Sequence, residues 1–140
     1  MVPTELSRIL ITETSDQQVI WLKEQNGTRS FPIVIGIFEA YAIKRKLNDE
    51  VIERPLTHDL LASVLGRLDV QVERIVVTAL KRTTFYASIV LQRNGETVTV
   101  DSRPSDAIAL AVRVGAPIFV EDEVFELVGK PEAPPEESQE

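Results

Sequence analysis

The sequence contains no cysteine and only one histidine, His58, among its 140 residues. Without thiols the chain can form neither a disulfide scaffold nor a thiolate metal site, and one histidine excludes most nucleophile–base pairs and nearly all zinc sites. A bound metal would therefore be a hard cation held by carboxylates, such as Mg²⁺, Mn²⁺ or Ca²⁺. The absence of cysteine also suits a reducing cytoplasm, which is the compartment we expect.

Long apolar runs and the sequence signatures of common enzyme classes are missing as well. No run approaches the roughly 20 residues of a membrane span, and the N-terminus meets polar residues too early for a secretory signal. We therefore expect no association with a membrane. There is no glycine-rich phosphate loop, no GxSxG elbow and no HExxH sequence.

Basic charge is scarce, and the net charge of −7 argues against generic binding to nucleic acid. Residues 131–140 carry four glutamates and no base, and we expect them to form a disordered acidic tail rich in proline and glutamate. Without them 18 acidic and 15 basic residues remain, a net charge of −3. The expected folded body, residues 1–130, is thus only mildly acidic, and its length suits a single domain.

Turn signals predict two β-hairpins. Asn26-Gly27 and Asn94-Gly95 are the residue pairs that type I′ turns require, because both central residues of that turn have positive φ. The expected registers place apolar residues opposite each other: Leu22 with Phe31 in the first hairpin, Leu91 with Val98 and Ile89 with Val100 in the second. The first register also places Glu24 opposite Arg29. Further strands are expected at 5–12, 72–80 and 117–121, the last of them buried or at a sheet edge.

Three helices are expected between the strands. The first begins near residue 35 or 36 and ends near residue 47. The second spans residues 57–68, with Thr57 as its N-cap and a stripe of leucine and valine along one face. The third spans residues 104–114, with Pro104 at its first position and Gly115 at its end. Hairpins interrupted by helices define an α+β domain with a mixed or antiparallel sheet.

The third predicted helix is apolar around most of its circumference, so it should be buried on nearly all sides. Charged residues nevertheless gather at its N-terminus, where Asp101 and Arg103 precede Pro104 and Asp106 follows it. Arg103 offers a planar fork for a carboxylate or a phosphate. A functional cluster and a purely structural ion network both explain such a group.

Two further carboxylates and the histidine occupy first turns of the other helices. Glu39 shares a face with apolar residues of the first helix, which suggests a site carboxylate or a partner for a buried arginine. The alternative is a first-turn acid that is stabilised by the helix dipole and points to solvent. The same alternative applies to Asp59. His58 is either an exposed first-turn residue or a base that acts near neutral pH.

Three stretches of the sequence, in this order and spacing, resemble the bifunctional nuclease domain family: "FPIVIGIFEAYAI", "RPLTHDLLASVL" and "VDSRPSDAIALAVRVGAPIFV". The resemblance covers about residues 15–125. It implies a compact α+β domain that associates as a homodimer, and nuclease activity on RNA and DNA. Carried over residue by residue, the family pattern picks out Glu39, Arg54, Pro55, Thr57, His58, Asp59, Asp101, Arg103, Pro104, Ser105 and Asp106.

The favoured hypothesis is therefore a nuclease that hydrolyses phosphodiester bonds. Its expected catalytic residues are Glu39, His58, Asp59, Asp101, Arg103 and Asp106. The expected substrate-binding residues are Arg54, Thr57, Arg103 and Ser105, and the expected ligands for Mg²⁺ or Mn²⁺ are Glu39, Asp101 and Asp106. The alternative is a non-catalytic dimeric binding module in which the same residues form a ligand pocket or a structural ion network.

Overall fold

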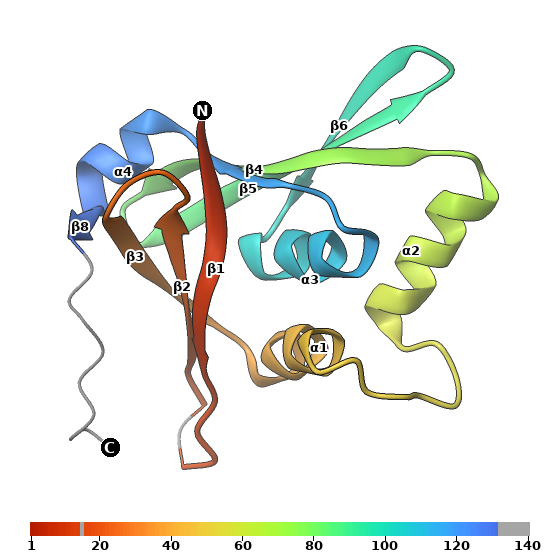
Figure 1. The fold of residues 1–140 in the computed structure, drawn as a ribbon, viewed down its shortest axis with the longest axis horizontal. Coiled ribbons are helices and arrows are strands. Elements are labelled where there is room, and N and C mark those ends of the chain that lie inside the picture. The colour runs from red at the N-terminus through yellow and green to blue at the C-terminus, as the bar shows by residue number, and fades with distance from the viewer. Residues whose placement is uncertain (15, 132–140) are drawn as a thin grey trace.

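The computed structural model describes residues 1–14 and 16–131, which form one α+β domain around an eight-stranded mixed sheet (Figure 1). The strand order is β6-β5-β4-β7-β1-β2-β3-β8. All neighbouring strands are antiparallel except β4 and β7, which are parallel. The strands are β1 (Val2–Leu10), β2 (Gln18–Glu24), β3 (Arg29–Ile35), β4 (Gln71–Lys81), β5 (Thr84–Arg93), β6 (Glu96–Ser102), β7 (Ile118–Val120) and β8 (Lys130–Pro131).

Both predicted hairpin registers are confirmed, because Leu22 pairs with Phe31 and Leu91 pairs with Val98. The turn at Asn94-Gly95 has the positive φ angles of a type I′ turn, 51° and 80°. The same turn type was wrongly predicted for Asn26-Gly27, since neither residue has a positive φ. There the side chain of Glu24 shapes the loop. It accepts a hydrogen bond from the Arg29 backbone N–H at 3.0 Å and pairs with the Arg29 guanidinium at 2.7 Å.

Strand β7 lies in the middle of the sheet, between β4 and β1. It pairs with β1 through Val2, Pro3 and Thr4, which is why β1 begins at residue 2 and not at residue 5 as predicted. Of the two placements that the sequence left open for this segment, the buried one is correct. Because both of its edges are hydrogen-bonded, β7 offers no edge for pairing with another molecule.

Within residues 1–14 and 16–131, four helices flank the sheet: α1 (Ile37–Leu47), α2 (Thr57–Arg67), α3 (Pro104–Val114) and α4 (Asp122–Val128). The sequence predicted the first three and missed α4, whose seven residues are too few to show a helical period. Tertiary packing holds α4 in place, since the Phe125 ring meets the Phe31 ring edge-on with centroids 5.2 Å apart.

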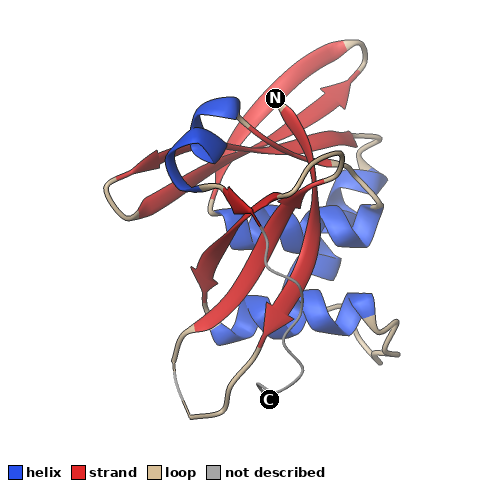
Figure 2. Cartoon of the chain, turned by 60° about the vertical axis from the view of Figure 1, so that its left-hand side comes forward, coloured by secondary structure: helices blue, strands red, loops and turns tan. Residues whose placement is uncertain are grey.

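Helix α3 is the centre of the helical layer, and α1 and α2 pack on either side of it (Figures 1 and 2). Its first position is Pro104, and it ends at Gly115, which has a left-handed φ of 74°. Burial on nearly all sides is confirmed, because most of its residues are inaccessible to solvent: Pro104, Ser105, Ala107, Ile108, Ala109, Leu110 and Ala111.

Helix α2 is, in contrast, not buried at any residue. Part of its apolar stripe faces outward, with Leu60 56% exposed and Leu68 59% exposed. The predicted N-cap, Thr57, is instead the first helical residue, and Leu56 is at the cap position. The Asp59 carboxylate accepts a hydrogen bond from the Leu56 backbone N–H at 3.0 Å. An acid in the third helical position therefore stabilises the start of this helix, and not the side chain of Thr57.

Of the predicted acidic tail, Pro131 belongs to the folded domain, because it pairs with Arg29 in the ladder between β3 and β8. The remainder, residues 132–140, lies outside the described residues. None of the helices in the described part of the chain combines the length and the apolar character needed to cross a bilayer.

Candidate functional site

A cleft of about 870 Å³ opens where α1, α2 and α3 begin, over the face of β5 and β6. Its walls are mostly apolar, with polar residues from all three helices and from β6 among them. Pro104 begins α3 in the middle of the layer, so the N-terminus of this buried helix reaches solvent at the cleft. The lining residues that carry polar groups are Glu39, Tyr41, Arg45, Thr57, His58, Asp101, Ser102, Arg103 and Asp106.

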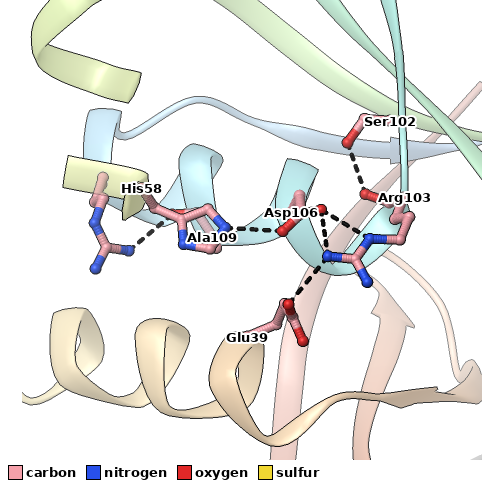
Figure 3. Close-up of polar contacts among 7 residues, drawn as sticks. Glu39, His58, Ser102, Arg103, Asp106 and Ala109 are labelled. Atoms are coloured by element: carbon pink, nitrogen blue, oxygen red, sulfur yellow. Dashed lines mark hydrogen bonds and ion pairs between the residues drawn. The ribbon is translucent and has the colours of Figure 1, made fainter. Parts of the chain in front are cut away.

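Four of the predicted site residues form one continuous chain of contacts from three helices (Figure 3). His58 Nε2 lies 2.9 Å from Asp106 Oδ1. The other oxygen of Asp106, Oδ2, accepts a hydrogen bond from Arg103 Nε at 2.9 Å. Arg103 Nη2 then donates to Glu39 Oε2 at 3.0 Å. The expectation that Glu39, Arg103 and Asp106 lie together is therefore met, with the arginine between the two carboxylates.

Arg103 occupies the N-cap position of α3, where it has no side-chain hydrogen bond to the helix backbone. Its guanidinium instead spans the mouth of the cleft, and its side chain remains 66% exposed. Hydrogen bonding to Asp106, the charge of Asp106 and the contact with Glu39 together raise the pKa of Arg103. Nη1 makes no hydrogen bond to any described residue, so one nitrogen of the fork is left for an incoming anion.

Asp59 was expected in the same cluster but points to the other side of α2. Its Oδ1 accepts a hydrogen bond at 2.6 Å from Arg113 Nε, in the last turn of α3. Burial raises the pKa of Asp59, but the hydrogen bonds from Arg113 and the Leu56 backbone outweigh burial and hold the pKa below its usual range. Asp59 and Arg113 line a second, smaller hollow and not the cleft, so the pair fastens the start of α2 to α3.

The remaining predicted residues fall into two groups. Asp101 and Thr57 line the cleft, and in the described part of the chain the Asp101 carboxylate has no ion-pair partner. Arg54 is exposed in the connection before α2, and Ser105 is buried in the first turn of α3. Neither Arg54 nor Ser105 lines the cleft, so their expected role in substrate binding stays a prediction.

The expected cation ligands were tested against this geometry. Arg103 Nη2 lies 3.0 Å from Glu39 Oε2 and 2.8 Å from Asp106 Oδ2, so a positive group already fills the space between these carboxylates. No group of three or more histidine or acidic side chains in residues 1–14 and 16–131 is placed to hold a metal ion. In this arrangement the residues do not fit Mg²⁺ or Mn²⁺, and a cation would require Arg103 to release both carboxylates.

Sequence reasoning missed two contributors to this region. Arg113, the partner of Asp59, is a single basic residue in a buried apolar helix. A charge in such a helix needs a partner, so the sequence could have indicated that Arg113 pairs with an acid. Arg45 lines both the cleft and the second hollow, and its buried Nε has no hydrogen-bond partner among the described residues. No local signal distinguishes Arg45 from its neighbours Lys44 and Lys46.

The fold and the cleft together define a class: α+β domains that place an acid–histidine–arginine chain where three helices begin. Comparison with known sequences identifies the family. Residues 20–133 match the bifunctional nuclease domain, and the chain belongs to this family.

The relatives include bacterial and plant proteins. An uncharacterized protein of Mycobacterium tuberculosis is 39% identical over 121 residues, which cover 86% of this chain and 72% of that protein. Bifunctional nuclease 1 of Arabidopsis thaliana is 30% identical over 105 residues, which cover 72% of this chain and 32% of that protein. Bifunctional nuclease 2 of Oryza sativa subsp. japonica is 26% identical over 114 residues, covering 79% and 35%. The matched part is thus about a third of each plant protein.

Proposed function

We propose that this protein is a nuclease that hydrolyses phosphodiester bonds of RNA or DNA in the cleft. The observation that carries the proposal is the contact chain of His58, Asp106 and Arg103, all three of which line the cleft. It joins an imidazole, a common general base, to a guanidinium, whose planar fork suits a phosphate. Membership of the bifunctional nuclease domain family, and the plant relatives named as bifunctional nucleases, support the same activity.

In the proposed reaction His58 is the general base. Asp106 binds Nε2, which fixes the orientation of the ring, and among the described residues nothing bonds the other ring nitrogen. That nitrogen takes a proton from the attacking water, whose oxygen forms the new bond to phosphorus while the bond from phosphorus to the leaving sugar oxygen breaks. The leaving oxygen takes its proton from solvent.

Arg103 binds the phosphate in this mechanism. Its fork is held by Asp106 and Glu39, so Nη1 is presented to the cleft mouth without further loss of side-chain entropy. Residue Asp101 lines the same cleft and has no ion-pair partner among the described residues, and we assign its carboxylate the orientation of the attacking water. Thr57 offers a hydroxyl to the substrate backbone.

No step of this mechanism passes through a metal ion. Use of Mg²⁺ or Mn²⁺ stays a prediction, and it requires the arginine to swing away from Glu39 and Asp106. We still expect the protein to work in the cytoplasm, because a chain without cysteine suits a reducing compartment.

The test is cleavage of fluorescent RNA and DNA oligonucleotides by highly purified protein, with EDTA in one series and Mg²⁺ or Mn²⁺ in another. Asp106→Asn keeps the size of the side chain and removes its charge, and we expect cleavage to fall by about 10²–10⁴-fold, the usual contribution of acid–base catalysis. Glu123→Ala, an exposed first-turn acid of α4 away from the cleft, is the control. Equal activity of the wild type and both variants would contradict the proposal.

One observation favours the alternative of a non-catalytic binding module. Three of the four predicted site carboxylates already have a cationic partner: Glu39 and Asp106 contact Arg103, and Asp59 contacts Arg113. A structural network would show the same saturation. If the oligonucleotides bind without being cleaved under any of these conditions, the binding module is the better assignment.

A further inference from the structure

Phe38 is an aromatic residue that contributes little to the core. It lies in the first turn of α1, lines the cleft and is 82% exposed. Most other aromatic rings contact a second ring or a cation: Trp21, Phe31, Phe85, Tyr86 and Phe125. Phe38 makes no such contact within the described part of the chain. An uncovered ring beside a cleft offers a surface on which another flat ring can stack.

The walls of the cleft suit a flat apolar group. Phe38, Tyr41, Ala42 and Arg45 recur at helical spacing, so one face of α1 turns towards the cleft and carries two aromatic rings one turn apart. Aliphatic side chains of α2 and the sheet line it as well: Leu61, Leu65, Ile89, Leu91 and Val100. The volume of about 870 Å³ is in the range of small-molecule sites, about 300–1,000 Å³, and far exceeds what a phosphate alone fills.

The guanidinium of Arg103 lies beside the turn of α1 that carries Phe38. Glu39, the next residue after Phe38, accepts the hydrogen bond from Arg103 Nη2 at 3.0 Å. Nη1 of the same arginine makes no hydrogen bond to a described residue. The cleft thus combines a group for an anion with a ring for stacking. A nucleotide combines the same two features, a phosphate and a flat base.

The charges of the cleft limit how many phosphates it can bind. Besides its histidine, the described residues that line it include two arginines, Arg45 and Arg103, against three acids, Glu39, Asp101 and Asp106. Glu39 and Asp106 already pair with Arg103. A duplex is bound mainly through many phosphates, each neutralised by a lysine or an arginine. This cleft can neutralise only one or two, so most of the affinity has to come from contacts with a base.

We propose that the cleft binds an unpaired nucleobase, which stacks on Phe38 while Arg103 holds the adjoining phosphate. The substrate is then a single strand, or an unpaired region, of RNA or DNA. This inference rests on the proposed nuclease function and names the substrate of the same site. A base in a duplex is covered on both faces by its neighbours, and it reaches such a cleft only after it leaves the stack. Every base has a face that can stack, so the site has no strict sequence preference.

A binding experiment with the full-length protein compares three fluorescent ligands of equal length: a single strand, its blunt duplex, and a strand of abasic spacers. Phosphorothioate linkages slow their hydrolysis, and anisotropy measures the affinity. The abasic strand should bind roughly 5- to 150-fold more weakly than the single strand, the effect of losing one base–aromatic stack, and the duplex at least about tenfold more weakly. Affinity for the single strand should fall with log salt at a slope of about −0.7 to −1.4, as for one or two phosphates.

Three results of this binding experiment would overturn the proposal. The first is no measurable binding of the single strand. The second is an abasic strand or a duplex that binds within about fivefold of the single strand. The third is a slope steeper than about −2, which means that an extended run of phosphates is bound.

Variants of Phe38 separate stacking from simple apolar burial. Phe38→Leu keeps an apolar side chain but loses the ring, and affinity for the single strand should fall at least about fivefold. Phe38→Trp keeps a ring and should bind at least as tightly as the wild type. Leu127→Ala, at a position of α4 that is 67% exposed and does not line the cleft, is the control and should change nothing. Circular dichroism confirms that each variant is folded. Wild-type affinity of Phe38→Leu, or an equal loss in Phe38→Trp, would contradict stacking on this residue.

Cleavage of unmodified strands distinguishes failure of this inference from failure of the nuclease function. Cleavage of the single strand at least about tenfold faster than that of the duplex supports both. Equal cleavage of the two forms contradicts the inference and leaves the nuclease function standing. If the single strand binds with the pattern above and is never cleaved, the nuclease function is wrong, and the cleft is a binding site for single strands.

Discussion

Arg103 is the residue on which the two functional readings differ most. It touches both Glu39 and Asp106, yet its own side chain is 66% exposed, so it lies in high dielectric at the mouth of the cleft. An ion pair in such a place contributes far less to stability than a buried one. The position of Arg103 is therefore better explained by a role in substrate binding at the cleft than by a contribution to the stability of the fold.

We therefore expect Arg103→Met to lower the free energy of unfolding by only about 1 kcal/mol and to abolish cleavage. Arg103→Lys keeps the charge but loses the fork, and it should retain little activity. Urea denaturation and the oligonucleotide assay measure the two quantities. A loss of about 3–5 kcal/mol for Arg103→Met, the usual result of breaking a buried pair, would assign the arginine to structure.

Asp59 gives a prediction about pH. Its pKa is lower in the folded chain than in the unfolded chain, where about 3.9 is usual. The ionised pair with Arg113 therefore stabilises the fold above the unfolded pKa, and this stabilisation is lost as pH falls through the folded pKa. The difference in unfolding free energy between wild type and Asp59→Asn should be constant from pH 7 to about pH 5 and shrink below about pH 4. Glu123→Gln serves as the control, and we expect its difference to stay small throughout. A difference for Asp59→Asn that grew on acidification would contradict the pairing.

At the scale of helices, strands and turns, local backbone geometry explains why some parts of the fold could be predicted from the sequence. The turn at Asn94-Gly95 and the end of α3 at Gly115 both need left-handed backbone, and glycine adopts it without strain. The type I′ turn predicted at Asn26-Gly27 is wrong, because the side chain of Glu24 accepts a hydrogen bond from the Arg29 backbone N–H and so holds the loop in another conformation. Side-chain contacts of this kind are not visible in a dipeptide signal.

Two glycine substitutions test this difference. Gly95→Ala should destabilise the protein by about 1–2 kcal/mol, because its φ of 80° is strained for any residue with a Cβ, although there is space around the added atom. Gly66→Ala, within α2, also meets open space and should stabilise it by about 0.5–1 kcal/mol, the helix propensity difference. Thermal denaturation of both variants measures this. Effects of the same sign would show that backbone conformation does not decide the outcome.

At the scale of the whole molecule, the cleft and the uncovered apolar surface lie on the same side. The three helices α1, α2 and α3 lie over one face of the sheet, while α4 packs near β3 and β4 (Figure 2). Of the exposed apolar residues of α2 and β6, Leu61 and Val100 line this cleft. If two copies of the chain associate through this region, the stability of the folded state rises with protein concentration.

We expect the melting temperature to rise by several degrees between about 1 and 100 μM protein, because the folded state associates and the unfolded state does not. Leu60→Lys, at a position 56% exposed in the single chain, should remove this dependence and leave the melting temperature at the lowest concentration nearly unchanged. Scanning calorimetry over a concentration series measures both. A melting temperature that stays constant for the wild type would contradict association in this range.

The sequence by itself determined the features that depend on neighbours in the chain. These are the α+β class, three of the four helices in the described part of the chain, the registers of both hairpins, and the ends of α3 at Pro104 and Gly115. Hydrophobic period, proline and glycine act within a few residues, so they can be read without knowing the fold. The recognition of Glu39, His58, Arg103 and Asp106 as belonging together also came from the sequence, through the order and spacing of three motifs.

Only the tertiary structure decided which of these residues touch. It directs Asp59 to Arg113 and away from the cleft, puts Arg103 between two carboxylates, and places β7 inside the sheet. Each of these contacts joins segments that are distant in the chain, such as Glu39 and Arg103. Their geometry follows from how the helices pack over the sheet, and no local pattern encodes it. The exposure of α2 has the same origin: its leucine stripe reads as a core face, and only the packed domain shows that a single chain leaves most of it uncovered.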